Sequence, residues 1–298
     1  MNGNGHIPVL IQEVLDYLDA AREGLYIDCT LGLGGHSLEI LKRNPQASLL
    51  GFDIDEKSLL EARKRMKPYS DRISLFHSDF RYLPDLKIDF QKVKGILLDL
   101  GLSSFQLDSP ERGFSYNLEG PLDMRMDLRN KITAFKILHK YSEYRLAQIF
   151  REFGEIKPAK RLAKEIISRR KAEKIVTTTD LRRIVEEIFR WRSQKGKIHP
   201  AAKVFQALRI EINQELIGLS EFIERITRKL PKKSRIAAIS FHSLEDRIIK
   251  HAFMHLAAPE DYRPFLKILT KKPVTPSNDE IALNSRSRSA KLRVAERI

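Results

Sequence analysis

A glycine-rich turn near the N-terminus joins a short apolar segment to a helical pattern. The apolar segment Tyr26–Thr30 leads into the turn Gly32–Gly35, and the helical pattern Ser37–Arg43 follows at once. Eighteen residues beyond Gly35, the next apolar segment ends on Asp53. Glycines let a backbone approach a ligand closely, and an acid at the end of the second strand accepts hydrogen bonds from ribose hydroxyls. This spacing predicts a site for an adenosine-containing ligand.

The small residues of the turn favour S-adenosylmethionine over a nicotinamide dinucleotide. A dinucleotide site calls for glycine or alanine at the third small position, so that the helix packs closely and its end binds pyrophosphate. Ser37 stands at that position, and Gly34 and Gly35 are adjacent. S-adenosylmethionine has no phosphate and does not need the dinucleotide pattern. An NAD-dependent oxidoreductase stays open as the less favoured alternative.

Acidic residues follow two further predicted strands. Ser78-Asp79-Phe80 comes after the third strand, where an acid can hold the adenine amine and Phe80 can cover the ring. Asp99 ends the fourth strand, beside the crevice in which open α/β sheets bind ligands. Ordinary core packing is the alternative interpretation of Phe80. The turn, Asp53, Asp79-Phe80 and Asp99 together indicate one ligand site.

These residues depend on an alternation of strands and helices. Strands are predicted at 26–30, 48–53, 73–78 and 94–100, with a helix over 56–67. Near-continuous apolar strands separated by helices imply a parallel sheet covered on both faces. A fifth strand at 234–241 is followed by a helix over 244–256, and two apolar segments, 265–270 and 290–295, close the chain. We expect the last segment to be the antiparallel strand of a mixed sheet.

The alternation stops in the middle of the chain. A polar loop over 108–127 precedes helical patterns at 134–138, 143–153, 160–171 and 179–191, and a long helix is predicted from Ala201 to about Leu230. We place the domain boundaries at 1–106 with 214–298 for the sheet, and at 107–213 for an inserted helical domain.

The inserted segment is strongly basic. Of the net charge of +15, residues 157–197 carry +9, with fourteen Lys or Arg against five Asp or Glu. A surplus of this kind favours a polyanionic partner, although a solvated helical surface is the plainer alternative. No helix-turn-helix or zinc-finger pattern occurs, so RNA is favoured over duplex DNA.

The composition of the chain limits the cellular compartments and the metal sites that we expect for it. No run of 18 apolar residues occurs, the N-terminus lacks the pattern of a signal peptide, and Cys29 is the single cysteine. We therefore expect a cytoplasmic protein with no membrane contact, no disulfide and no metal site. The sequence leaves the oligomeric state unknown.

Several longer motifs are distributed over nearly the whole chain, at 6–10, 33–37, 95–101, 111–115, 120–127, 205–210, 240–247 and 286–293. The most specific strings contain Met-Arg-Met and Ser-Phe-His-Ser-Leu-Glu-Asp-Arg. In these motifs the chain resembles one family, the bacterial ribosomal RNA small subunit methyltransferase H family of 16S rRNA cytosine-N4 methyltransferases.

The resemblance implies the fold, the cofactor and the substrate. The implied fold class is α/β, a Rossmann-like class I S-adenosylmethionine-dependent methyltransferase sheet with an inserted all-helical domain. The implied substrate is a decoding-centre cytidine of 16S rRNA, within the small ribosomal subunit or a late assembly particle. The implied contacts with S-adenosylmethionine are Gly34, Gly35, His36, Asp53, Phe80, Asp99 and Gln106.

The residues after the fourth strand depart from the motif that usually acts on an amino nitrogen. Many amino-methyltransferases carry an (Asn/Asp/Ser)-Pro-Pro-aromatic motif after the fourth strand, whereas this chain has Asp99-Leu100-Gly101-Leu102-Ser103-Ser104-Phe105. We hypothesise that Asp99, Ser104 or His242 supplies the catalytic acceptor, and that His242 and the loop Asp123–Asp127 line the cytidine pocket. A helix cap is the alternative for His242, and a loop closed by its own salt bridges is the alternative for Asp123, Arg125 and Asp127.

Two further residues are candidates for RNA contact. Trp191 lies among arginines and could stack on a base, although a tryptophan in a helical core is the alternative. Arg288 belongs to a basic C-terminal group, with Arg286, Lys291 and Arg293, that could bind phosphates, unless these residues form the exposed face of the last strand. A non-catalytic RNA-binding ribosome assembly factor on a methyltransferase fold remains a second open function.

Overall fold

The structure is a computed structural model that describes residues 8–192, 199–259 and 263–298. The chain divides into two compact units. The sheet unit contains the chain up to Gly101 together with Leu216–Ile298, and the helical unit is Leu102–Glu215. Part of the basic segment predicted to bind RNA, 193–197, and the start of the motif at 6–10 lie outside the described residues.

One seven-stranded sheet forms the centre of the sheet unit, in the order β3-β2-β1-β4-β5-β7-β6. Strands β1 to β5 pair in parallel, whereas β7 pairs antiparallel with both β5 and β6. The predicted α/β fold with a mixed sheet is confirmed. The strands are β1 (Gly24–Asp28), β2 (Ala47–Asp53), β3 (Ile73–His77), β4 (Val93–Asp99), β5 (Arg235–Ser240), β6 (Leu266–Ile268) and β7 (Lys291–Arg297).

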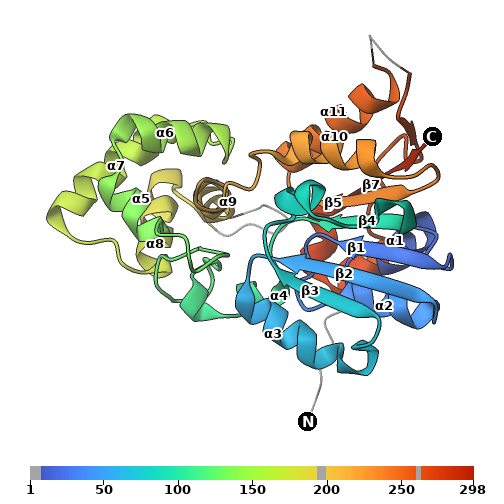
Figure 1. Cartoon of the computed structure of the whole chain (residues 1–298). Coiled ribbons are helices and arrows are strands. Elements are labelled where there is room, and N and C mark those ends of the chain that lie inside the picture. The colour runs from blue at the N-terminus through green and yellow to red at the C-terminus, as the bar shows by residue number, and fades with distance from the viewer. Residues whose placement is uncertain (1–7, 193–198, 260–262) are drawn as a thin grey trace. The chain divides into compact units, whose positions relative to one another are not determined.

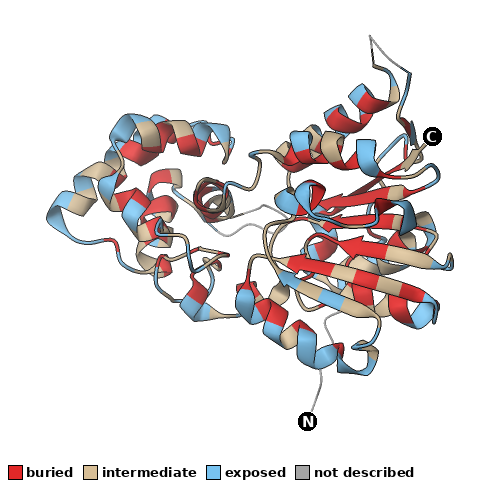
Figure 2. Cartoon of the chain, in the orientation of Figure 1, coloured by how far each residue is buried: buried red, intermediate tan, exposed pale blue. Residues whose placement is uncertain are grey.

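Helices cover both faces of this sheet (Figure 1). On one face the core joins strand residues to α10 (Leu219–Lys229) and α11 (Ser243–Ala257). On the other face it joins them to α1 (Ile11–Tyr17), α2 (Gly35–Arg43) and α3 (Glu56–Arg65). Figure 2 shows buried residues running along the strands, as the near-continuous apolar segments predicted.

The helical unit contains six α-helices among its described residues. Four of them begin at hydroxyl N-caps, since the side chains of Ser103, Thr133, Ser142 and Thr177 each accept a bond from a backbone amide. The helices are α4 (Ser104–Leu107), α5 (Ala134–Lys140), α6 (Glu143–Glu152), α7 (Ala159–Ala172), α8 (Thr178–Phe189) and α9 (Pro200–Asn213).

The single long helix predicted from Ala201 to about Leu230 is wrong. The chain forms α9 and α10 instead, because Gln214 adopts a left-handed conformation (φ 51°) and Gly218 another (φ 73°). A left-handed residue ends a helix, and the break lies where the helical unit gives way to the sheet unit. Helices α1 and α12 (Asn278–Leu283) were not predicted from the sequence.

Among the described residues, no helix has both the length and the apolar composition that crossing a membrane requires.

Candidate functional site at the carboxyl ends of the strands

The glycine turn after β1 is held by a buried carboxylate. Asp28 ends β1 with 2% of its surface exposed, and its Oδ2 accepts a hydrogen bond of 2.7 Å from Ser37 Oγ. Its Oδ1 accepts a second bond from the Thr30 amide, at 3.2 Å. Burial raises the pKa of Asp28, and the Ser37 bond acts in the opposite direction. Ser37, the residue that departs from the dinucleotide pattern, thus anchors the start of α2.

Gly34 and Gly35 are needed for close packing within the protein. Gly34 precedes α2 with φ 74°, and a Cβ there would lie 2.7 Å from Met66 Sδ. A Cβ on Gly35 would lie 2.6 Å from Pro8 Cγ. Both contacts are too short for a side chain. The glycines therefore keep the turn tight against α3 and the N-terminal segment, and their predicted contact with a cofactor remains a prediction.

Asp53 closes the same turn from the end of β2. Its Oδ2 accepts a bond from the Gly32 amide at 2.7 Å, and its Oδ1 accepts one from the Asp55 amide at 2.8 Å. Burial raises the pKa of Asp53 to about 6, although these amide bonds oppose the rise. A carboxylate has about four acceptor positions, so two remain for ribose hydroxyls.

His36 and Asp99 form a pair between the first turn of α2 and the end of β4. His36 Nδ1 lies 3.4 Å from Asp99 Oδ2, and His36 Nε2 lies 2.9 Å from the Val9 carbonyl oxygen. The Asp99 amide donates to Thr30 Oγ1 at 2.6 Å, while Asp99 Oδ1 is buried without a hydrogen-bond partner. Burial and the charge of Glu245 raise the pKa of Asp99 to about 7, and burial lowers the pKa of His36.

Asp79 and Phe80 follow β3 in a short 3-10 helix. The Asp79 side chain caps this helix and accepts bonds from the guanidinium of Arg81, which also donates to the Ile217 carbonyl. The Phe80 ring packs edge-on against Phe222 of α10, with centroids 4.8 Å apart. The core-packing interpretation of Phe80 therefore describes its present contacts, and an adenine contact is still a prediction.

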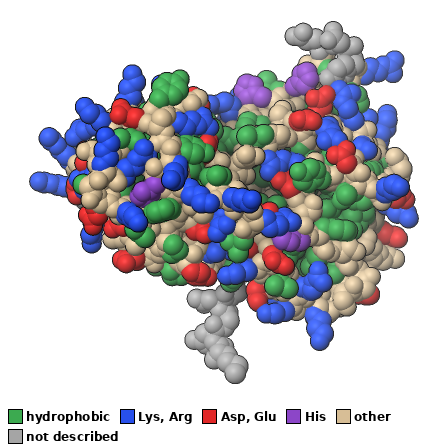
Figure 3. Space-filling model, turned by 60° about the vertical axis from the view of Figure 1, so that its left-hand side comes forward, with side chains coloured by type: hydrophobic (Ala, Val, Ile, Leu, Met, Phe, Trp, Pro, Cys, Tyr) green, Lys and Arg blue, Asp and Glu red, His purple; other side chains and the backbone are tan. Residues whose placement is uncertain are grey.

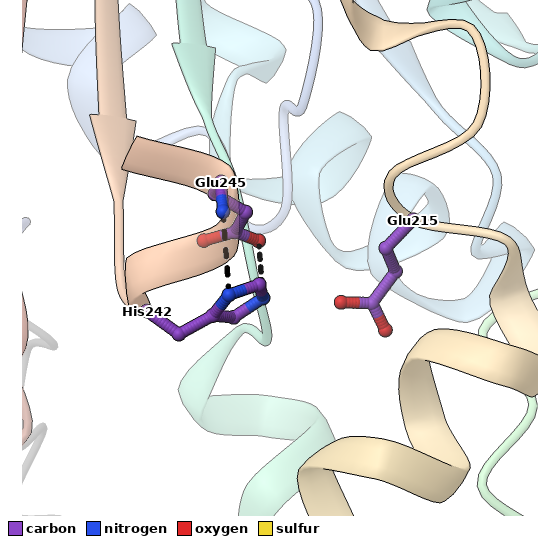
Figure 4. Close-up of side chains that lie close together, drawn as sticks. All are labelled: Glu215, His242 and Glu245. Carbon is purple, nitrogen blue, oxygen red and sulfur yellow. Dashed lines mark hydrogen bonds and ion pairs between the residues drawn. The ribbon is translucent and has the colours of Figure 1, made fainter. Parts of the chain in front are cut away.

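His242 lies just beyond β5 and caps α11. Its Nδ1 accepts from the Glu245 amide at 3.4 Å, and its Nε2 lies 3.2 Å from Glu245 Oε1, as Figure 4 shows. Glu245 Oε2 also accepts from the Phe241 amide at 2.9 Å. The capping role that the sequence left open is thus present. Glu215, also drawn in Figure 4, belongs to the helical unit and pairs there with Arg209.

The loop Asp123–Asp127, in the helical unit, is closed by its own ion pairs. The Arg125 guanidinium donates to both carboxylate oxygens of Asp123 at 2.7 and 2.8 Å, and Asp127 pairs with Arg129. The Asn213 side chain bonds the Met126 amide and the Met124 carbonyl. These contacts agree with the alternative interpretation, a loop closed by its own salt bridges. They leave its role in binding a cytidine untested.

The other predicted residues have mainly structural contacts. Gln106 and Ser103 form a reciprocal capping box on α4, whose first residue is Ser104. Trp191 follows α8 and lies edge-on to His199, with ring centroids 5.2 Å apart. Arg288 is exposed.

Two members of the basic C-terminal group are already paired. Lys291 Nζ lies 3.2 Å from Asp246 Oδ2, and Arg293 Nε lies 2.6 Å from Asp246 Oδ1. Their charge is therefore shared with a carboxylate, whereas Arg286 and Arg288 are exposed at the surface.

The candidate residues thus fall into two groups. Gly34, Gly35, His36, Asp53, Phe80, Asp99 and His242 lie at or just beyond the carboxyl ends of neighbouring strands of the sheet unit, which also contains Arg288, just before β7. Ser104, Gln106, Asp123, Arg125, Asp127 and Trp191 belong to the helical unit. Asp28, Thr30 and Asn213 are supporting residues that were not predicted. The position of Asp28 at the end of the first strand is the signal that could have identified it.

Comparisons with known proteins cover the whole chain. Residues 3–298 match a family model described as the MraW methylase family. A protein named Ribosomal RNA small subunit methyltransferase H from Sulfurihydrogenibium azorense is 46% identical over 295 residues, covering 98% of this chain and 99% of the relative. Its namesake from Caldicellulosiruptor saccharolyticus is 45% identical over 309 residues, with the same coverage. A crystal structure described as an rRNA methylase from Streptococcus thermophilus is 11% identical, with a TM-score of 0.44 and 99% coverage of each chain.

Proposed function

Since the chain belongs to the MraW methylase family, we propose that it transfers a methyl group from S-adenosylmethionine to 16S rRNA. The proposed acceptor is the exocyclic N4 of a decoding-centre cytidine. The observation that carries the proposal is the match over residues 3–298, together with relatives at 45–46% identity that are named as small subunit rRNA methyltransferases. We further propose that the substrate is the small ribosomal subunit or a late assembly particle in the cytoplasm.

The chemistry of the strand-end residues fits this cofactor. Asp28, Asp53 and Asp99 bring three carboxyl groups to adjacent strands, and burial raises the pKa of each. A bound cation stabilises carboxylates, and S-adenosylmethionine carries a sulfonium and an amino group. Asp99 Oδ1 is buried and lacks a hydrogen-bond donor, a need that a ligand's N–H or O–H would satisfy. A pyrophosphate would instead add negative charge beside these acids.

Positioning and proton acceptance are the tasks left to the protein. When bound, S-adenosylmethionine supplies a methyl group that is attacked in line by the acceptor nitrogen. Orientation of the two reactants can contribute roughly 7–11 kcal/mol to such a step. The N4 lone pair is delocalised into the ring, so a carboxylate that accepts a hydrogen bond from N4 makes the nitrogen more nucleophilic. We assign this acceptance, and the uptake of the proton that leaves N4, to Asp99.

We assign RNA recognition to the helical unit. A base must leave its stack before an enzyme can act on it, and flanking phosphates then need cations to hold them. The basic character of this unit supports the assignment, and Arg288 and His242 are the proposed RNA contacts of the sheet unit. The contacts proposed within the helical unit are Asp123, Arg125, Asp127 and Trp191.

Calorimetry and methyl incorporation test the proposal together. The purified chain should bind S-adenosylmethionine and its demethylated by-product, and NAD should produce no binding heat. Labelled methyl should enter 16S rRNA in small subunits from a strain that lacks the enzyme. Binding of the cofactor without methyl transfer to free rRNA, subunits or assembly intermediates would favour the non-catalytic assembly factor. Binding of NAD alone would favour the oxidoreductase.

A further inference from the structure

Helix α7 of the helical unit has two chemically different faces. Its buried residues, Ala159, Leu162, Ala163 and Ile166, recur at helical spacing. The helix packs this face against α5, α6 and α8. Lys160, Arg161, Lys164 and Lys171 are exposed, and at 100° per residue they fall on the opposite side. We call these four cations the α7 stripe. With a rise of about 1.5 Å per residue, the stripe runs for about 16 Å along the helix.

Other cations of the helical unit are held by neighbours. Arg125 pairs with Asp123, Arg145 with Glu211 and Arg209 with Glu215. On α7 itself, Arg169 pairs with Glu165 and Glu187, and Arg170 donates to the carbonyls of Leu138 and Tyr141. Within the described part of the chain, no residue of the α7 stripe has an ion pair. Several arginines of the unit are therefore engaged within it, whereas the α7 stripe faces solvent without an ion pair.

The acids nearest in sequence do little to neutralise the stripe. Glu165 is engaged by Arg169, which leaves Glu173, just beyond the end of the helix, as the remaining acid between residues 157 and 174. Exposed Lys157 and Lys174 extend the positive charge past both ends of the helix. Figure 3 shows Lys and Arg side chains projecting from the surface of the molecule.

We propose that the α7 stripe is the phosphate-binding track of the helical unit, along which it holds the RNA backbone. The inference rests on the proposed function in taking RNA as the partner. Exposed lysines act as point charges that attract phosphates without reading bases. The stripe therefore supplies affinity, and the choice of nucleotide is made elsewhere. A row of cations on one straight helix suits a single strand or one strand of a duplex.

The salt dependence of RNA binding makes the proposal quantitative. Each phosphate neutralised in a single-stranded nucleic acid contributes about −0.7 to the slope of log affinity against log salt. Four cations therefore predict a slope that is smaller in magnitude by about 2.8 once they are removed. The affinity for RNA at 0.1 M KCl should fall by more than about tenfold.

The test compares two full-length variants that lose the same charge. In the stripe variant, Lys160, Arg161, Lys164 and Lys171 are all replaced by Gln. In the control variant, four exposed cations of the sheet unit, Lys57, Arg63, Lys67 and Lys87, are replaced by Gln. The dissociation constant of a single-stranded 16S rRNA segment is measured between 0.05 and about 0.3 M KCl, the range over which such slopes develop. Affinity for S-adenosylmethionine and the thermal unfolding midpoint are measured in parallel.

The stripe variant should show the smaller slope and the weaker RNA binding, while the control variant stays close to the wild type. Equal losses in both variants would indicate a general charge effect and would overturn the proposal. Unchanged RNA binding, with lost binding to vesicles of anionic lipid, would assign the surface to a membrane instead and would also overturn it.

Two further results keep the test decisive. If the stripe variant fails to fold, the charge-conserving variant K160R/R161K/K164R/K171R should keep the wild-type slope, and Lys164→Glu alone should lower it. Methyl incorporation is measured separately. If the wild-type protein never methylates RNA but the stripe variant binds RNA more weakly, the proposed function is contradicted and the role of the α7 stripe is supported. If the wild-type protein methylates RNA and the stripe variant binds RNA equally well, only the role of the α7 stripe is contradicted.

Discussion

His36 Nδ1 faces Asp99 Oδ2 at 3.4 Å, while the other ring nitrogen faces the Val9 carbonyl oxygen at 2.9 Å. Because a carbonyl oxygen can only accept, Nε2 must carry a proton and donate it to Val9. In neutral His36, Nδ1 then presents a lone pair to Asp99. The contact is favourable only if a proton lies between Nδ1 and Oδ2. The raised pKa of Asp99 and the lowered pKa of His36 agree that below about pH 7 this proton lies on Asp99.

Cofactor affinity should depend on this proton. The pKa of Asp99 is about 7, so the side chain becomes a carboxylate as pH rises through neutrality and then attracts the sulfonium more strongly. We expect the affinity for S-adenosylmethionine to rise between pH 6 and 8 and binding near pH 7 to release protons. Calorimetry in buffers of different ionisation enthalpy measures both quantities. Asp99→Asn should remove most of the pH dependence, and a dependence that survives the substitution would assign it to another group, with Asp53 the first candidate.

The ionisation of Asp99 should also destabilise the folded protein. A carboxyl pKa raised from 3.8 to about 7 means that the folded state holds a proton that the unfolded state has lost. This contribution is fully present below about pH 4 and is lost as pH rises through 7. Relative to the wild type, Asp99→Asn should gain stability between pH 5 and 8. The upper limit is about 4 kcal/mol, since one pKa unit corresponds to about 1.4 kcal/mol.

Thermal or urea unfolding at several pH values measures this difference. Asp71→Asn, at an exposed position of the same unit, controls for the loss of one negative charge. A stability gap between wild type and Asp99→Asn that does not change with pH would contradict the assignment.

Removing the Ser37 hydroxyl should weaken the glycine turn. Ser37→Ala leaves the buried Asp28 carboxylate without its 2.7 Å donor, and the loss of such a partner costs about 1–3 kcal/mol. The free energy of unfolding should fall by this amount, and cofactor affinity should fall with it because the turn is less ordered. Ser70→Ala, at an exposed serine, is the matched control. Equal stability of the two variants would show that the Ser37 bond contributes little.

Two substitutions at His242 separate its capping role from its proposed role in the reaction. His242→Ala loses the cap on α11 and should destabilise the protein by about 0.5–2 kcal/mol. His242→Asn restores a capping side chain but removes the imidazole. We expect both variants to bind S-adenosylmethionine nearly as well as the wild type and to methylate at least about tenfold more slowly, within the range assigned to general acid–base groups. Full methylation activity in His242→Asn would show that His242 acts only as a helix cap.

Local patterns were sufficient to predict the sheet. The apolar segments at 48–53 and 94–100 differ by one residue at most from β2 and β4, because strands buried on both faces must be continuously apolar. The break between α9 and α10 was missed because Gln214, a residue with ordinary helical propensity, adopts the left-handed conformation. The nearby Gly218, with φ 73° just before α10, is the sequence signal for the break.

The contacts of the candidate site were harder to foresee, because they join distant parts of the sequence. The Asn213 side chain reaches Met126, 87 residues away, and the Asp99 amide reaches Thr30, 69 residues away. No periodicity encodes such pairs. Residue type at a strand end did predict where the acids gather, since parallel strands bring their carboxyl ends to one edge. It did not predict that Asp28 would accept hydrogen bonds from Ser37 and Thr30.

The most direct measurement locates the methyl group. Small subunits from a strain that lacks the enzyme are treated with the purified chain and S-adenosylmethionine, and the 16S rRNA is digested and analysed by mass spectrometry. A mass increase of one methyl on a single decoding-centre cytidine, with fragmentation that assigns it to N4, is the predicted result. A methyl on another base, on the ribose, or on no nucleotide of 16S rRNA would contradict the account.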